Sequence, residues 1–307
     1  MITSICMNPS FDKTVEVDTL AVGEVNRIRA SRQDVGGKGI NVAIVARRLG
    51  LDVRCVGLAG RDGAETINNA LDQERIEHDF VLTSGAVRTN TKIVSGDGKG
   101  VTELNEPGSQ PTQEELDALF ELVRQKARNS EYLVLTGSLP PGCPPETYRE
   151  LIRCAGDVPC ILDVGGEALN LGVEAKPFLI KPNLQELQAT VGMELRTMRA
   201  IRDAATSYVR KGVKHVVVSM GSMGAMYVDE EKAAFAPALK VKVSSTVGAG
   251  DAMIGGLLKG LSRETSFAKV FRYGVAAGAA SVMTEGTQLI VAADFQNLLD
   301  QVRVQEV

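Results

Sequence analysis

The stretch YLVLT (132–136) decides the fold, together with two runs like it, CILDV (160–164) and FLIK (178–181). Each run is continuously apolar instead of alternating, which is typical of parallel strands buried on both faces of a sheet. Further runs of this kind lie at 2–7, 53–59 and 215–219. Together these segments predict the strands of one mostly parallel sheet.

Segments with helical periodicity separate these runs. They include residues 39–49 and 197–211, each followed by a glycine, and a helix after Thr112 that ends near Arg128. Thr112 and Glu115 have the spacing of a capping box, which marks the start of that helix. The alternation of strand and helix predicts an α/β fold: an open, doubly wound sheet with helices on both faces.

Two stretches, 14–34 and 88–104, alternate polar and apolar residues without a helical pattern. Such alternation is typical of half-exposed strands. We expect both stretches to project from one edge of the sheet as a small β-lid. Residues 1–307 are therefore predicted to form a single domain, with the lid strands as insertions.

Composition argues against nucleic acid as a partner. The net charge is -4, aromatic residues make up 4% of the chain, and tryptophan is absent. A nucleic-acid surface normally needs clustered positive charge and aromatic side chains that stack on bases.

The five cysteines are scattered, and no two have the C-x-x-C spacing of a zinc or redox site. This pattern indicates reduced thiols and a cytoplasmic location. We expect neither a secretion signal nor a membrane span, because the chain lacks a basic start followed by a long apolar run. The two histidines, His78 in a polar connection and His215 in an apolar run, are expected to be structural. Acid–base chemistry then falls to carboxylates or lysines.

The stretch STVGAGDAMIGGLLKGL (245–261) places a turn of small residues directly before a helix. Gly248, Ala249 and Gly250 let the backbone approach a ligand, and the unpaired amides of the first helical turn favour an anion. Asp251 lies at the mouth of this turn, where a carboxylate can accept a proton from a hydroxyl that attacks a phosphate. The spacing fits a simple helix N-cap equally well.

The stretch DVGGKGINVA (34–43) has a similar form. Its glycines surround Lys38 just before another helix, which offers backbone amides and one mobile cation to a ligand. Asn41 is polar in an otherwise apolar helix start. The alternative interpretation is a glycine-rich turn with a solvated lysine.

Two further motifs allow structural and functional interpretations. In IKPNLQEL (180–187), Asn183 and Glu186 form a capping-box-like pair, and Glu186 is also suited to a hydrated Mg²⁺ beside nucleotide phosphates. The stretch SMGSMGAMYV (219–228) is a glycine-punctuated turn after a buried strand, as in an ordinary hairpin.

The predicted lid carries two rows of polar side chains at alternating positions: Arg88, Asn90 and Lys92 in one row, and Arg27, Arg29 and Ser31 in the other. Alternate residues of a strand point to one face. Cations on one face suit a substrate that already carries a phosphate. The alternative is an exposed strand that its charges protect from edge-to-edge pairing.

Together these segments resemble the ribokinase-like, pfkB-type carbohydrate kinases, specifically the branch that acts on phosphosugars. The likeness extends from NPSFDKT (8–14) to the glycine-rich C-terminal helices. GGKGINVA resembles the family's N-terminal signature, and STVGAGD its C-terminal signature, with Ser245 where many members carry Asp or Asn. The motifs TGSLPPG (136–142), KPNLQEL and SMGSMGA occur in the expected order, so the combination is specific.

The resemblance implies an ATP-dependent kinase with Mg²⁺ as cofactor and assigns roles to matching residues. Asp251 would be the catalytic base, and Gly248, Ala249 and Gly250 would form an anion hole. The sugar and its phosphate would be bound by Asp12, Gly37, Lys38, Asn41, Ser138, Arg88, Asn90, Lys92 and Arg27. The nucleotide would contact Lys181, Asn183, Glu186, Ser219, Gly221 and Gly224, with Glu186 near Mg²⁺ through water. In similar enzymes the lid also forms a dimer interface, so we expect a homodimer.

Three functions remain open from the sequence. Within the branch, GEVNRIRA (23–30) and VRTNTKI (87–93) look most like enzymes that phosphorylate fructose 1-phosphate to fructose 1,6-bisphosphate. Tagatose-6-phosphate kinases share these motifs, so tagatose 6-phosphate is the alternative substrate. A non-catalytic sugar-phosphate sensor is a third reading, although it would not need Asp251. A nicotinamide-dependent oxidoreductase fits poorly, because the first strand runs into MNPSFD and not into G-x-G-x-x-G.

Overall fold

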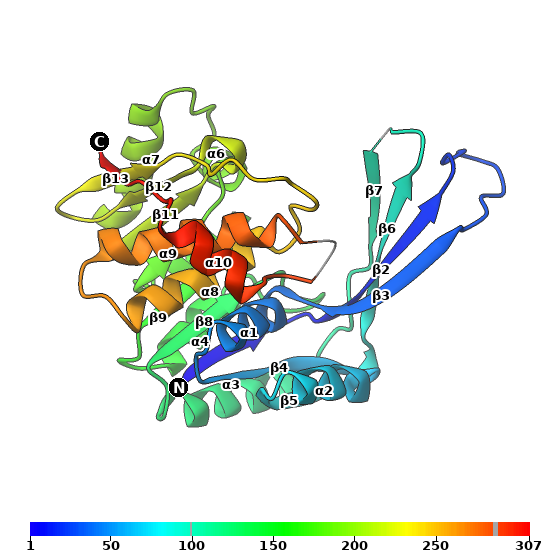
Figure 1. The fold of residues 1–307 in the computed structure, drawn as a ribbon. Coiled ribbons are helices and arrows are strands. Elements are labelled where there is room, and N and C mark those ends of the chain that lie inside the picture. Colours follow the sequence, from blue (N-terminus) through cyan, green and yellow to red (C-terminus); the bar gives the residue numbers. More distant parts are fainter. Residues whose placement is uncertain (99, 285–287) are drawn as a thin grey trace.

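The computed structural model describes residues 1–98, 100–284 and 288–307. Within this part of the chain, ten strands form the main sheet in the order β14-β13-β12-β11-β10-β9-β8-β1-β4-β5 (Figure 1). All neighbouring pairs from β11 to β5 are parallel, and β12, β13 and β14 extend the other edge with antiparallel pairs. The parallel strands are β1 (Ile2–Cys6), β4 (Val53–Asp62), β5 (Glu77–Ala86), β8 (Tyr132–Thr136), β9 (Cys160–Asp163), β10 (Leu179–Ile180) and β11 (His215–Ser219), and the antiparallel ones are β12 (Ala225–Val228), β13 (Ala233–Ala236) and β14 (Gln305–Glu306).

Helices cover both faces of this sheet. One buried cluster joins it to α1 (Lys38–Arg48), α2 (Ala64–Gln73), α8 (Ala249–Leu261), α9 (Phe267–Ser281) and α10 (Ala292–Leu299). A second buried cluster joins the opposite face to α3 (Gln113–Ala127), α4 (Thr147–Cys154), α5 (Gly166–Val173), α6 (Leu184–Val191) and α7 (Met198–Arg210). A short 3₁₀ helix, η1 (Gly221–Met223), connects β11 to β12.

Strand β8 shows why the apolar runs are continuous. Val134 packs in the cluster that contains α1 and α8, whereas Leu133 and Leu135 pack in the cluster that contains α3 and α4. Side chains alternate between the two faces of a strand, so a strand covered on both faces must be apolar at every position. The predicted doubly wound α/β fold is confirmed.

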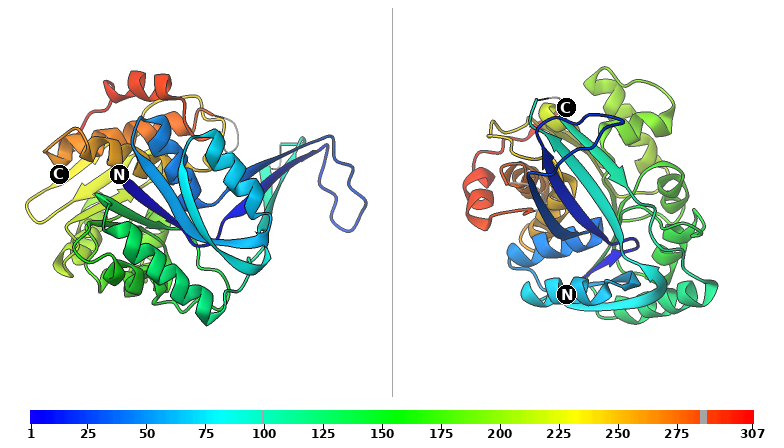
Figure 2. Two further views of the ribbon diagram at one scale, coloured as in Figure 1. Left: turned by 90° about the horizontal axis from the view of Figure 1, so that it is seen from below. Right: turned by 90° about the vertical axis from the view of Figure 1, so that its right-hand side faces the viewer.

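The lid is a separate sheet of four strands among the described residues, in the order β3-β2-β6-β7. Its strands are β2 (Ser10–Val17), β3 (Ala30–Gly36), β6 (Arg88–Ser95) and β7 (Gly100–Asn105). It stands to one side of the body, with the loop between β2 and β3 at its far end (Figures 1 and 2). The chain enters the lid after β1 and again after β5, so segments distant in sequence pair side by side.

Three details of the sequence interpretation are wrong. Strand β2 begins at Ser10, so Asp12 belongs to the lid, because its pairing with β6 extends to Arg88. Arg27 and Arg29 do not share a strand with Ser31: β3 begins only at Ala30, whose partner in β2 is Glu16, one residue before β2 ends. His78 lies not in a connection but in the edge strand β5, whose charged residues hid its alternation.

Candidate active site

Two adjoining cavities lie where the parallel strands end and the lid begins. The smaller, of about 360 Å³, is lined by Asp251 and Gly250 of α8, by Asp163 at the end of β9, and by Lys181 directly after β10. The larger, of about 770 Å³, is lined by residues of the lid and by Ser138. The two cavities share four lining residues and therefore lie side by side: Lys38, Arg88, Asn90 and Val247.

Asp251 lies in the first turn of α8, after Gly248 with φ 77°. The left-handed backbone at Gly248 turns the chain sharply into the helix, a conformation that favours glycine. Only 5% of Asp251 is exposed, and burial raises the pKa of its carboxyl to about 6, although Lys38 opposes this shift. A buried carboxylate that titrates near neutrality, with its face toward a cavity, is suited to accept a proton.

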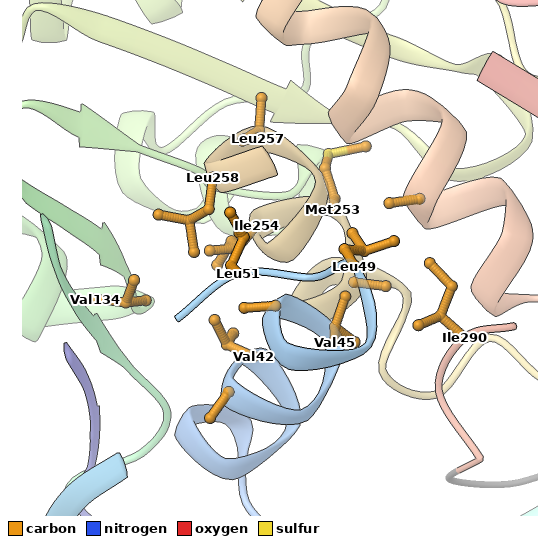
Figure 3. Close-up of a cluster of buried hydrophobic side chains, with 14 of the residues drawn as sticks. Val42, Val45, Leu49, Leu51, Val134, Met253, Ile254, Leu257, Leu258 and Ile290 are labelled. Carbon is orange, nitrogen blue, oxygen red and sulfur yellow. The ribbon is translucent and has the colours of Figure 1, made fainter. Parts of the chain in front are cut away.

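Close packing of α1 against α8 determines what Asp251 contacts. A Cβ atom at Gly255 would lie 2.4 Å from Cγ1 of Val45, so the glycine allows the two helices to approach. Figure 3 shows Val42 and Val45 of α1 on the side of α8 that carries Ile254, whereas Leu257 points away from α1. The approach brings Asn41 to Asp251: Asn41 Nδ2 donates a hydrogen bond of 2.8 Å to Asp251 Oδ2.

The first turn of α1 contributes a cation. Lys38 is the first residue of α1 and lines both cavities. The negative charge of Asp163, followed by those of Asp251 and Glu186, raises the pKa of Lys38, so its ammonium group stays charged. Gly37, with φ 114°, packs against Cys6 and Pro9.

A buried ion pair lies beneath the smaller cavity. Nζ of Lys181 is 3.1 Å from Oδ1 of Asp163, and their side chains are 4% and 2% exposed. The tip of Lys181 lies beside the turn before α8, since a Cβ atom at Gly250 would be 3.1 Å from its Nζ. The pair fixes the Lys181 ammonium group beside the first turn of α8.

The predicted pair Asn183 and Glu186 forms a complete capping box at the start of α6. Glu186 Oε2 accepts a hydrogen bond of 2.8 Å from the Asn183 backbone N–H. Both residues also line the smaller cavity, as does Ser219, whose backbone forms a bridge with Asn183. The structural and functional readings of this motif are therefore compatible in space.

Asp12 organises the polar side chains of the lid. Its Oδ1 accepts hydrogen bonds from Ser10 Oγ at 3.0 Å and from Asn90 Nδ2 at 3.1 Å, and its Oδ2 lies 3.6 Å from Nζ of Lys92. Arg88 donates to the backbone carbonyls of Asn8 and Glu106. Arg88, Asn90 and Lys92 line the larger cavity together, so they share one face of β6 as the alternation indicated.

Three polar atoms at this site are buried and have no hydrogen-bond partner within the described parts of the chain: Asn41 Oδ1, Asn90 Oδ1 and Arg88 Nε. Buried polar atoms are rarely left unsatisfied, because each costs free energy when it loses water. Two free acceptors and one free donor beside the cavities suit a polar ligand that carries hydroxyls and an anionic group.

Some predicted site residues lie elsewhere. Arg27 is exposed on the loop between β2 and β3 and lines neither cavity. Gly221 is the first residue of η1 and Gly224 follows its last residue; neither lines a cavity, and Gly224 packs against the backbone of β13. Ala249 begins α8 beside the cavity-lining Gly248 and Gly250.

Sequence reasoning also missed residues that line the cavities: Asn8, Glu103, Asn105, Thr136 and Asp163. Glu103 and Asn105 face Lys92 and Asn90 across the β6–β7 pair, so all four share one face of the lid. The alternation in VTELN (101–105) could have predicted this, because Glu103 and Asn105 are two residues apart in a strand and so point to the same face. Asp163 ends a buried strand, a position typical of functional residues in open α/β sheets.

The whole chain can be placed among known proteins. Residues 6–293 match the model of the pfkB family carbohydrate kinases, so the chain belongs to this family of phosphotransferases with an alcohol group as acceptor. It is 34% identical to the 1-phosphofructokinase of Vibrio cholerae, over 99% of this chain and 96% of that relative. It is 37% identical to the 1-phosphofructokinase of Rhodobacter capsulatus, over 90% of this chain and 88% of that relative.

A solved structure supports the same placement. The phosphofructokinase-2 of Escherichia coli in complex with fructose-6-phosphate superposes with a TM-score of 0.88, at 31% identity and 98% coverage of both chains.

In the described ranges of our structure, no helix has both the length and the apolar character that a bilayer crossing requires.

Proposed function

We propose that this chain transfers the γ-phosphoryl group of ATP to the C6 hydroxyl of fructose 1-phosphate, which yields fructose 1,6-bisphosphate and ADP. One observation carries the proposal: the buried Asp251 carboxylate lies in a cavity with Lys38 and Lys181, next to a lid cavity lined by Arg88 and Lys92. This arrangement offers one region for a sugar phosphate and another for the phosphates of a nucleotide. The 1-phosphofructokinase relatives add support for the choice of sugar.

In the proposed step, the C6 oxygen attacks the γ-phosphorus in line with the bond to the β–γ bridging oxygen. The new O–P bond forms as that bridging bond breaks, ADP leaves with its electron pair, and the hydroxyl proton passes to Asp251. The cations of Lys38 and Lys181 and the first-turn amides of α8 offset the charge on the transferred group.

The residues present also fit Mg²⁺, which prefers oxygen ligands. Glu186 uses Oε2 for its capping box. Its other carboxylate oxygen, Oε1, lies near Gly165, since a Cβ atom built at Gly165 would be 3.5 Å from it. We propose that this oxygen binds the ion through water. Mg²⁺, when bound, neutralises the phosphates of the nucleotide.

Two other sugars are alternatives. Tagatose 6-phosphate needs the same cations and the same base, and fructose 6-phosphate is the ligand of the Escherichia coli structure. Asn90, Glu103 and Asn105 line the larger cavity, and we propose that they distinguish these sugars through their hydroxyls.

The test is Mg²⁺-dependent ADP release with fructose 1-phosphate, tagatose 6-phosphate, fructose 6-phosphate and fructose, compared by kcat/KM. We expect a clear preference for fructose 1-phosphate. A preference for another phosphosugar would overturn the substrate while keeping the role of Asp251. Binding of a sugar phosphate without turnover of any sugar would favour the sensor.

We also propose that a second copy of the chain covers the lid. Val22 and Val25, on the loop between β2 and β3, are 93% and 88% exposed, an unusual position for apolar side chains. A dimer through this loop would bring Arg27 toward the other chain's site. Sedimentation analysis should show a dimer that Val25→Asp weakens by at least about tenfold in Kd, and a monomeric wild-type chain at micromolar concentration would contradict this proposal.

A further inference from the structure

Asp163 has no task in the proposed chemistry, although it lies at the centre of the charged groups. It ends β9, and its side chain is 2% exposed. Burial of a carboxylate is costly unless charges and hydrogen bonds compensate for the lost water.

Both oxygens of Asp163 are engaged. Oδ1 is 3.1 Å from Nζ of Lys181, and Oδ2 accepts a hydrogen bond of 3.1 Å from Thr136 Oγ1 and lies 3.8 Å from Nζ of Lys38. Burial alone would raise the pKa of Asp163, but the charges of Lys181 and Lys38 bring it below its ordinary value. Asp163 is therefore a permanent negative charge and a poor proton acceptor.

The two lysines are held differently. Lys181 is at hydrogen-bond distance and almost fully buried, so its ammonium group is fixed beside the turn before α8. Lys38 is beyond hydrogen-bond distance, its side chain is 44% exposed, and it lines both cavities. A lysine side chain with four rotatable bonds can leave such a loose contact for a nearby phosphate.

We propose that Asp163 is a positioning residue: it fixes the Lys181 ammonium group beside Gly250 and holds the Lys38 ammonium group at the cavity until a phosphate takes it over. The inference rests on the proposed kinase function and extends it to a residue that contacts neither the sugar nor the transferred proton. Preorganised charge at the reacting group contributes to the rate without reorganisation during the reaction.

The main test is Asp163→Asn in the full chain, with ATP, Mg²⁺ and the preferred sugar phosphate. We expect kcat to fall by ~10–100-fold, as for displaced catalytic groups, while KM for the sugar and the Mg²⁺ concentration for half-maximal activity stay within about threefold. Thr136→Val is the matched comparison: it removes a neutral hydrogen bond to the same carboxylate and keeps its charge, so kcat should fall by less than in Asp163→Asn. A kcat near that of the wild type, or activity restored by extra Mg²⁺, would overturn the proposal.

A second variant addresses folding. Asp163→Asn leaves Lys181 buried without a counter-charge, which destabilises a protein more than removal of both charges does. The double variant Asp163→Asn with Lys181→Met removes both and should fold, with a kcat no higher than that of Lys181→Met alone. A double variant with wild-type kcat would contradict the positioning role.

The last measurement does not depend on catalysis. The pKa of Lys38 can be followed by NMR of isotope-labelled lysines, and it should fall in Asp163→Asn because Asp163 is the largest cause of its raised value. If the wild type phosphorylates none of the sugars but this pKa falls, the kinase proposal fails while the Asp163–Lys38 contact stands. An unchanged pKa would overturn the role of Asp163 whatever the activity.

Discussion

Two glycine-rich turns, one leading into α1 and one leading into α8, look alike in sequence. Each includes the first residues of its helix, and the two differ in what surrounds their glycines. At Gly39, a Cβ atom would lie 2.6 Å from the Ile5 carbonyl oxygen and 2.7 Å from the Cys6 Cα atom, both of them backbone atoms of β1. At Gly250, the nearest atom would be Nζ of Lys181, at 3.1 Å. The first glycine is required for packing, whereas the second keeps space open in front of the charged groups.

The two turns also differ in charge. The turn before α1 supplies the ammonium group of Lys38, and the turn before α8 supplies the carboxylate of Asp251. Because α1 and α8 pack against each other, these opposite charges meet in one cavity, where Asn41 donates a hydrogen bond to Asp251. Similar glycine-rich turns can therefore place opposite charges at one site.

The largest expected effect separates the chemistry of the two turns. Asp251→Asn should keep the fold and ligand binding but lower kcat by ~10²–10⁴-fold, because the proton acceptor is lost while shape and hydrogen bonding to Asn41 are kept. Steady-state kinetics and thermal unfolding of the same preparation check this. Turnover within a few-fold of the wild type would show that Asp251 has only a structural role at the start of α8.

A second prediction uses pH to distinguish the turns. Burial raises the pKa of Asp251 to about 6, and only the ionised form accepts a proton, so kcat/KM should fall by about tenfold per pH unit below that value. The pKa of Lys38 is raised above its ordinary value, so this lysine stays charged and adds no step near neutrality. A pH–rate profile from pH 5 to 8 tests the difference, and a flat profile would contradict the role of Asp251.

The smallest expected effect concerns the glycines themselves. Gly39→Ala should lower the free energy of unfolding by ~1–3 kcal/mol, because its methyl group meets the backbone of β1, which cannot move aside. Gly250→Ala should change stability by less than ~1 kcal/mol, since the Lys181 ammonium group needs to shift by only a few tenths of an ångström, and this shift should lower kcat. Denaturant unfolding and kinetics of both variants provide the comparison, and equal losses of stability would show that the two turns do not differ as described.

Much of the fold could be predicted from local patterns. Continuous apolar runs indicated buried parallel strands, the box at Thr112 and Glu115 marked the start of α3, and the alternation along β6 placed Arg88, Asn90 and Lys92 on one face. The loop with Arg27 was misassigned because alternation shows which residues share a face but not whether a partner strand exists.

The sequence by itself determined the strands, the helix starts and the two glycine-rich turns, because these depend on residues within a few positions of one another. Only the tertiary structure decided which distant groups meet. Asn41 reaches Asp251 across 210 positions of the chain, Lys181 pairs with Asp163, and Glu103 comes to face Lys92. The raised pKa of Asp251 is likewise decided by the tertiary structure, because its carboxyl is buried beside other charges only after α1, α8 and the sheet have packed together.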